Sequence, residues 1–161
     1  MSLEENRASG NAVGAPSGID VVDSPEPETE LWWCSVAPVE ARLQAFARWL
    51  SPAERERAAR FGTPQLRDRY VMGRGTLRSI LGRALGTDPA SVEIVRGTRG
   101  RPQLAGTPAL DFNISHTAGV AIIGITRRGR IGVDVERLDR AINVYGIARK
   151  FLTSDERSAI A

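Results

Sequence analysis

The middle of the chain carries apolar residues at helical spacing, which predicts three consecutive helices. The first is expected over residues 39–50, where five apolar residues share one face: Val39, Leu43, Phe46, Trp49 and Leu50. The second begins at Ser51, because a serine N-cap, a proline at the first helical position and Glu54 together form a capping box, and it ends near Gly62. The third is expected over about residues 64–85.

The third predicted helix combines an apolar face with four arginines, which are Arg67, Arg69, Arg74 and Arg78. Gly73 and Gly75 lie inside it, and each lowers helix propensity by about 1 kcal/mol relative to alanine. We interpret the two glycines as a sign of close packing or of close approach by a ligand at this point of the helix.

Apolar runs on either side of the helices predict short strands. The predicted strands are residues 30–37, 91–95, 103–104, 118–126 and 131–136. A basic turn at residues 127–130 separates the last two, so we expect them to pair as a hairpin. Two helices are expected after Asp139, one around Ile147 and one that starts at a capping box formed by Thr153 and Glu156.

The composition of the 161 residues, 42% hydrophobic and 25% charged, is that of an ordinary soluble globular protein. Residues 1–29 contain few large apolar groups, and we expect them to be a disordered tail. The chain has neither an apolar run of membrane-spanning length nor the pattern of a secretory signal, so we expect a cytoplasmic monomer without a membrane partner. Cys34 is the only cysteine, which excludes an internal disulfide and a cysteine-rich zinc site.

Charge is unevenly distributed along the chain, although the net charge is only +3. Residues 1–40 carry eight acidic residues against one arginine, whereas residues 41–101 carry thirteen arginines against five acidic residues. Arginine suits bidentate recognition of phosphate, but a general bias toward solvated arginines explains the pattern equally well. A basic middle segment indicates an anionic partner, which is a nucleic acid, a phosphate-bearing ligand or an acidic protein.

Residues 131–136 carry two carboxylates two positions apart, Asp134 and Glu136. On an extended strand these side chains point to the same face from backbone positions about 6.6 Å apart, and Val133 and Val135 point to the other face. Two carboxylates at this distance suit a hard cation such as Mg²⁺. A strand with an acidic solvent face has the same pattern, so the pair alone does not decide between the two interpretations.

Four separated motifs follow one another along the chain. They are the helix with Arg69, Gly73 and Arg78, the turn Gly100-Arg101-Pro102, the run Asn113-Ile114-Ser115-His116, and the run Gly132-Val133-Asp134-Val135-Glu136 with residues 151–156 beyond it. In this combination the chain, from about residue 30 to its end, resembles the 4′-phosphopantetheinyl transferases that serve polyketide and nonribosomal peptide synthetases. The resemblance implies an α+β fold of two related lobes, a pseudo-dimer with a small antiparallel sheet and helices in each lobe. It implies a first lobe at residues 30–110 and part of a second at residues 111–161, with coenzyme A in the cleft between them.

The same resemblance implies the reaction and its metal. The phosphopantetheine arm of coenzyme A would pass to a serine of an apo acyl or peptidyl carrier protein, with Mg²⁺ at the pyrophosphate. Asp134 and Glu136 match the paired metal carboxylates of these enzymes. Glu156 matches their third acidic residue, although its place in a capping box accounts for it equally well.

The resemblance also implies which residues bind coenzyme A. Arg69 and Arg101 match basic residues directed at its 3′-phosphate and adenine end, and Arg101 stands where a lysine is commoner. His116, the only histidine, matches a histidine placed on a phosphate of coenzyme A, although a lone histidine is often a structural hydrogen-bonding residue. Ser115 and Thr117 are candidate hydroxyl donors, or simply turn residues.

One motif of these transferases has no counterpart in the 161 residues. It is a Trp-x-x-Lys-Glu-x-x-x-Lys element that follows the third acid and supplies a proposed general base and a lysine for the pyrophosphate. No catalytic residue is therefore matched, and we expect a C-terminally truncated form with weak or no catalysis. Two other hypotheses remain, a fragment that only binds coenzyme A or a carrier protein, and a basic nucleic-acid-binding domain. Sparse aromatic residues disfavour the latter.

Overall fold

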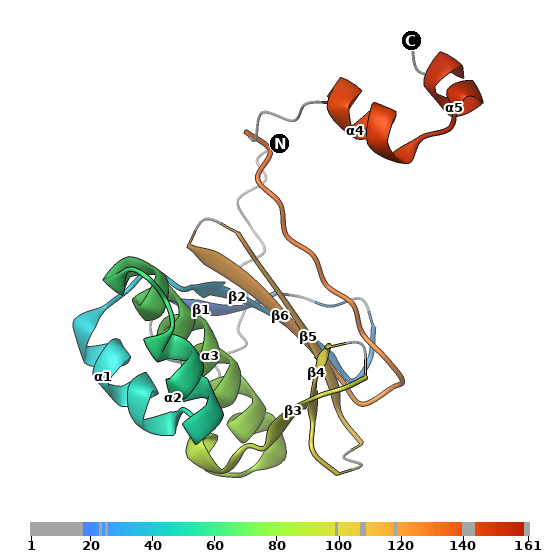
Figure 1. The fold of residues 1–161 in the computed structure, drawn as a ribbon. Coiled ribbons are helices and arrows are strands. Elements are labelled where there is room, and N and C mark those ends of the chain that lie inside the picture. Colours follow the sequence, from blue (N-terminus) through green and yellow to red (C-terminus); the bar gives the residue numbers. More distant parts are fainter. Residues whose placement is uncertain are drawn as a thin grey trace, which may run out of the picture.

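The computed structural model describes residues 18–22, 24, 26–98, 100–106, 109–117, 119–139 and 144–159. It confirms the predicted α+β class, with helices packed on one face of an antiparallel sheet (Figure 1). The strands are β1 (Ile19–Val22), β2 (Thr29–Ser35), β3 (Ile94–Arg96), β4 (Pro102–Leu104), β5 (Asp111–Thr117) and β6 (Val120–Thr126). The helices are α1 (Glu40–Trp49), α2 (Pro52–Ala59), α3 (Pro64–Leu85), the 3₁₀ turn η1 (Pro89–Ser91), α4 (Val144–Phe151) and α5 (Ser154–Ala159).

The larger sheet has the strand order β1-β2-β6-β5, and all neighbouring strands in it are antiparallel. β5 and β6 form a hairpin in which Thr117 pairs with Val120. β3 and β4 form a separate two-stranded sheet. β5 is an edge strand of the larger sheet, so the side chains on both faces of β5 lie along that edge of the sheet.

The core lies between the larger sheet and the helices α1 and α3. Alternate strand residues are buried on the helix-facing side, as expected for a sheet with one covered face: Trp32, Cys34, Phe112, Ala121, Ile123 and Ile125. They form one hydrophobic cluster with buried residues of the helices, which include Phe46, Met72, Leu77 and Leu81. This covered face fixes the register of the strands, because a shift by one residue would expose the whole set.

The helix starts predicted from the sequence are confirmed by side-chain contacts. Ser51 Oγ accepts a hydrogen bond from the Glu54 N–H at 3.2 Å, and the Glu54 carboxylate accepts one from the Ser51 N–H at 2.9 Å. Thr63 caps α3, and Gly86 ends it in the left-handed conformation with φ of 66°. The capping box at Thr153 is also formed, with a 2.8 Å bond from its N–H to Glu156.

The predicted hairpin between residues 118–126 and 131–136 is wrong. β6 is already flanked by β2 and β5, so neither of its edges is free for a further strand. Residues 131–136, here called the carboxylate segment, are instead extended and run over the sheet in the direction of β5, without backbone pairing (Figure 1). The segment packs over Gly124 of β6, where an added Cβ would lie 2.7 Å from side-chain atoms of Ile131 and Val133.

Two strands of the sheet were not predicted. β1 lies inside the stretch 1–29 that was expected to be a disordered tail, and its Ile19 is buried against the core. Residues 1–17 lie outside the described residues. β5 contains the run from Asn113 to His116, whose polar residues hide the strand pattern in the sequence.

The predicted lobe boundary between residues 110 and 111 stays a prediction. In the described structure, β5 and β6, which follow this boundary, join the same sheet as β1 and β2. α4 and α5 lie away from this sheet, and the described residues complete no second sheet-and-helix lobe (Figure 1). Within the described ranges, no helix has both the length and the apolar character needed to cross a membrane.

The two glycines in α3 have different surroundings, which predicts opposite effects of alanine. Gly75→Ala is expected to lower the free energy of unfolding by about 1–3 kcal/mol, because its Cβ would lie 2.2 Å from Cγ of Phe46. Gly73→Ala is expected to raise it by about 0.5–1 kcal/mol, since no atom lies within 4 Å and helix propensity improves. Urea unfolding of the two variants measures both values, and equal effects would contradict the assignment of Gly75 to helix packing.

Candidate functional site

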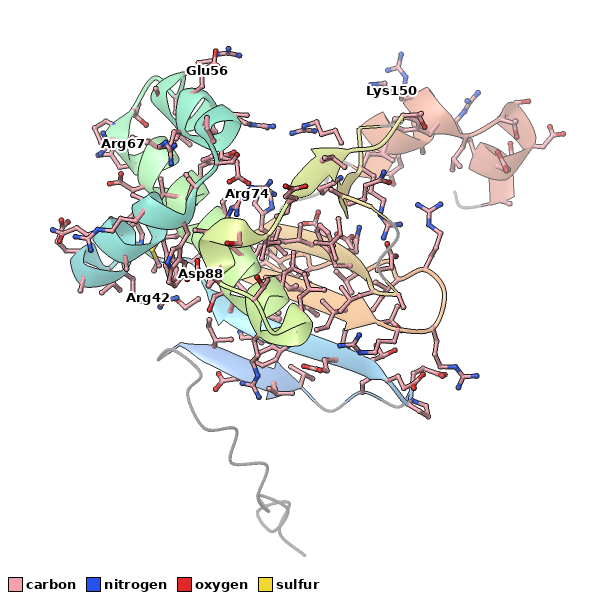
Figure 2. All side chains as sticks on the ribbon, turned by 90° about the horizontal axis from the view of Figure 1, so that it is seen from below. Arg42, Glu56, Arg67, Arg74, Asp88 and Lys150 are labelled. Atoms are coloured by element: carbon pink, nitrogen blue, oxygen red, sulfur yellow. The ribbon has the colours of Figure 1, made fainter. Side chains whose placement is uncertain are left out.

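A cavity of about 680 Å³ lies where α2 and α3 meet β5 and the β3–β4 sheet. The lining residues on α3 are three or four positions apart, as one face of a helix requires: Leu66, Arg69, Tyr70, Gly73 and Arg74. α2 contributes Glu54 and Arg57, and β5 contributes Ile114 and His116, which are two apart and so point to one face. Figure 2 shows Arg74 between the helices and the β3–β4 strands. Arg69 and His116, which are distant in the sequence, therefore line one cavity.

The cavity is basic, since four arginines and one carboxylate line it: Arg57, Arg69, Arg74, Arg96 and Glu54. The Arg57 guanidinium lies over the Tyr70 ring, 5.6 Å from its centre, and Arg96 donates to the carbonyl of Gly100 at 3.0 Å. Within the part of the chain that the structure describes, the side chains of Arg69 and His116 form no hydrogen bond or ion pair. Their donors are thus left for a ligand.

Glu54 connects the cavity wall to the core through two arginines. Its carboxylate lies 2.6 Å from Arg74 and 2.7 Å from Arg78, and Arg78 also donates to the carbonyls of Pro89 and Val92 at 2.9 Å each. Burial alone would raise the pKa of Glu54, but the hydrogen bond from the Ser51 N–H and the two arginines outweigh it and hold the pKa below its ordinary value. Glu54 therefore stays charged and holds Arg74 at the cavity wall.

Tyr70 lies among these charges on the same face of α3. Burial raises the pKa of its hydroxyl, and the neighbouring Arg74 acts in the opposite direction. The hydroxyl is therefore protonated at neutral pH and can donate a hydrogen bond into the cavity.

Arg101 does not line this cavity in the described structure. Its Nη2 donates to the Asp111 carboxylate at 2.7 Å and to the carbonyls of Phe112 and Ile131 at 2.8 Å each. The guanidinium thus ties the start of β5 to the start of the carboxylate segment, and its expected contact with coenzyme A stays a prediction.

Ser115 lies on the face of β5 opposite to His116, because successive strand residues point to opposite faces. Its hydroxyl donates to the Asp134 carboxylate at 2.7 Å and accepts a hydrogen bond from the Val135 N–H at 3.2 Å. Asp134 and Glu136 are both exposed while Val133 and Val135 are half-buried, so the predicted alternation is confirmed even though the segment is not a strand.

Glu156 lies in α5, away from the carboxylate segment (Figure 1). Its carboxylate accepts hydrogen bonds from Thr153, which lower the pKa of Glu156. No group of three or more histidine, cysteine, aspartate or glutamate side chains is arranged to hold a metal ion among the residues that the structure describes. Asp134 and Glu136 are therefore neighbours, and Glu156 is not brought to them.

Comparison with known proteins decides the family. Residues 33–126, more than half of the chain, match the family described as "4′-phosphopantetheinyl transferase, N-terminal". The chain belongs to this transferase family. The match covers the end of β2, the helices around the cavity, both strands of the small sheet and the β5–β6 hairpin.

Individual members of the transferase family match most of this chain. The 4′-phosphopantetheinyl transferase HetI of Nostoc sp. is 37% identical over 132 residues, which are 80% of this chain and 56% of the relative. The 4′-phosphopantetheinyl transferase Sfp of Bacillus subtilis is 28% identical over 115 residues, 71% of this chain and 50% of the relative. The chain spans about half the length of the curated relatives it matches.

Several residues that line this cavity were missed by the sequence reasoning, namely Glu54, Arg57, Tyr70 and Arg96. The helical spacing from Arg69 to Tyr70, Gly73 and Arg74 was a signal that these residues share a face. Nothing in the sequence indicated that α2 and the β3–β4 sheet would complete the wall, because that depends on how the elements pack.

Proposed function

We propose that this chain binds coenzyme A in the cavity lined by Arg69 and His116, and that the protein transfers the 4′-phosphopantetheine arm to a serine of an apo acyl or peptidyl carrier protein. We place this activity in the cytoplasm, in a monomer that serves polyketide or nonribosomal peptide synthesis. The observation that carries the proposal is the cavity itself, where Arg69 and His116 have donors left for a ligand. The names of the relatives, all phosphopantetheinyl transferases, support it.

The proposed reaction requires neutralisation of a strongly anionic substrate. The serine hydroxyl attacks the β-phosphorus of coenzyme A, a new P–O bond forms, and the pyrophosphate bond breaks to release adenosine 3′,5′-bisphosphate. Negative charge on the phosphates is stabilised by fixed donors that are in place before the reaction. Arg69 and His116 are the candidate donors to phosphate. Arg74 is held at the cavity wall by Glu54, so its charge is available without reorganisation.

The carboxylate segment is the candidate metal site of this proposal. Asp134 and Glu136 are exposed, alternate along an extended backbone and offer the hard oxygen donors that Mg²⁺ prefers, so the donor chemistry fits. When bound, Mg²⁺ supplies charge neutralisation at the pyrophosphate oxygens. Glu156 remains a candidate third carboxylate.

Arg69→Ala and His116→Ala are each expected to raise the Kd for coenzyme A by about 10- to 100-fold. The reason is that a hydrogen bond to a charged phosphate contributes about 1.5–3 kcal/mol. Arg67→Ala is the matched control, because Arg67 lies two positions before Arg69 on α3 but pairs with Asp68 outside the cavity (Figure 2). Isothermal titration with coenzyme A measures all three, and a larger effect at Arg67 than at Arg69 would contradict the proposed site.

Transfer is tested with fluorescent coenzyme A and an apo carrier protein, with and without Mg²⁺, in this chain and in any longer form of the protein. Mg²⁺-dependent labelling of the carrier serine is the expected result. Binding of coenzyme A without labelling in every form would favour the binding-only alternative. Salt-sensitive binding to DNA with no response to coenzyme A would overturn the proposal in favour of a nucleic-acid-binding role.

A further inference from the structure

Three polar side chains of β5 hold the carboxylate segment through hydrogen bonds, and these replace the backbone hydrogen bonds that would join two strands of a sheet. We call Asp111, Asn113 and Ser115 the polar row. They accept hydrogen bonds from the N–H groups of Ile131, Val133 and Val135 at 2.8, 3.0 and 3.2 Å. The sequence offset is 20 residues each time, so the segment runs parallel to β5 in one fixed register.

The match between the polar row and the segment follows from strand geometry. Side chains at every second residue of β5 point to one face and repeat at about 6.6 Å. The N–H groups of alternate residues in an extended segment point to one side with the same repeat. Three consecutive acceptors can therefore meet three consecutive donors only when both chains are extended and aligned.

Both ends of the segment are held by further contacts. At its start, Arg101 donates to the Ile131 carbonyl and to Asp111, so both backbone polar groups of Ile131 are engaged. Near its end, the Ser115 hydroxyl donates to the Asp134 carboxylate. Between them, Ile131 and Val133 pack on Gly124, where an added Cβ would lie 2.7 Å from Ile131 Cδ1 and Val133 Cγ1 and would displace them.

The hydroxyl of Ser115 has a single proton, and in the structure that proton is donated to Asp134. Ser115 can therefore not donate to a phosphate of coenzyme A while it holds Asp134. The hydrogen bonds of Arg101 likewise lie on β5 and the segment rather than in the cavity.

We propose that Arg101, Asn113 and Ser115 are positioning residues, which fix the register of the carboxylate segment and so present Asp134 and Glu136 as a pair, and that the Ser115 hydroxyl acts on Asp134 rather than as a ligand of coenzyme A. Only the consequence for Mg²⁺ rests on the proposed function. The hydrogen-bonded register is a property of the chain without metal or substrate, and it can be measured separately.

The first test is amide hydrogen exchange of the metal-free protein by NMR. Asn113→Ala is expected to speed exchange of the Val133 amide by about two- to tenfold, and Ser115→Ala that of the Val135 amide by a similar factor. Asn113→Asp, which keeps an acceptor oxygen, restores protection at Val133. Thr117→Ala is the matched control, because Thr117 is on the same face of β5 but forms no side-chain hydrogen bond to the described residues of the segment. Unchanged exchange at Val133 and Val135 in both alanine variants would overturn the proposal.

Gly124→Ala provides a second variant that removes no hydrogen-bonding group and lies outside the cavity. The added methyl group pushes Ile131 and Val133 off the sheet, so exchange at all three segment amides is expected to rise by about tenfold or more. A faster exchange confined to the amides of β6 itself would contradict the proposed packing of the segment on Gly124.

The last measurement separates positioning from ligand binding. Titration of Mg²⁺ into the coenzyme A complex of Ser115→Ala is expected to show about 10- to 100-fold weaker metal binding, with metal-free affinity for coenzyme A within about twofold of the unmodified chain. The reverse pattern, weaker coenzyme A binding with unchanged Mg²⁺ affinity, would identify Ser115 as a ligand and overturn the proposal. If the exchange results hold but the unmodified chain binds neither coenzyme A nor Mg²⁺, the proposed function fails and the register of the segment stands.

Discussion

Arg78→Ala is expected to lower the free energy of unfolding by about 3–5 kcal/mol, the largest stability effect of any single substitution considered for this chain. Arg78 is 2% exposed, and its loss removes one of the two arginines that pair with the buried Glu54 carboxylate and leaves the carbonyls of Pro89 and Val92 without their donor. The loss of a charged partner in a water-poor site is costly because solvent does not replace the hydrogen bonds that are lost. Urea unfolding followed by circular dichroism measures the change.

Two further variants show whether the network, rather than the loss of an arginine as such, is responsible. Arg60→Ala removes an exposed arginine that pairs with Glu56 on the surface, and it is expected to cost no more than about 0.5 kcal/mol. Glu54→Gln is expected to be less destabilising in the Arg78→Ala background than in the unmodified chain, because the charge it removes has already lost one of its two arginine partners. Additive effects would show that Glu54 and Arg78 are not coupled.

Asp134→Asn is expected to slow phosphopantetheine transfer by about 10²- to 10³-fold in any form of the protein that is active. If Asp134 holds the proposed metal, several kcal/mol of charge stabilisation would depend on its carboxylate, whereas asparagine keeps the shape and can still accept the hydrogen bond from Ser115. The rate is measured over a range of Mg²⁺ concentrations, and the half-saturating concentration is expected to rise.

The control for this prediction is Asp139→Asn. Asp139 is an exposed acid three residues beyond Glu136 that pairs with Arg137, so its charge is similar but it lies outside the carboxylate segment. Its transfer rate and Mg²⁺ dependence are expected to match those of the unmodified chain. If Asp134→Asn behaved like this control, the assignment of Asp134 to the metal would be wrong.

Local sequence signals predicted the helices well because their causes are local. The Ser51 and Thr153 capping boxes, the proline at the start of α2 and the apolar spacing of α1 all act within a few residues. Gly75 was flagged by its cost to helix propensity, and Phe46 explains why that cost is tolerated. Recognition of the family likewise needed only the sequence, and the family match over residues 33–126 confirms it.

Strand pairing could not be predicted in the same way, because it depends on which edges other strands leave open. The carboxylate segment has the alternation of a strand, but β2 and β5 already occupy both edges of β6. β5 was missed because the polar row interrupts its apolar pattern. These residues are polar because they accept hydrogen bonds from the N–H groups of the carboxylate segment.

The sequence by itself determined the helix boundaries, the charge asymmetry and the family, since capping, periodicity and motif spacing are written along the chain. Only the tertiary structure decided which residues meet. It separated His116 from Ser115, because neighbours on a strand face opposite sides. It turned Arg101 away from the cavity, so that its Nη2 donates to Asp111 and to two carbonyls. It gathered Arg57, Arg69 and Arg74 around one cavity, because two helices and an edge strand pack there.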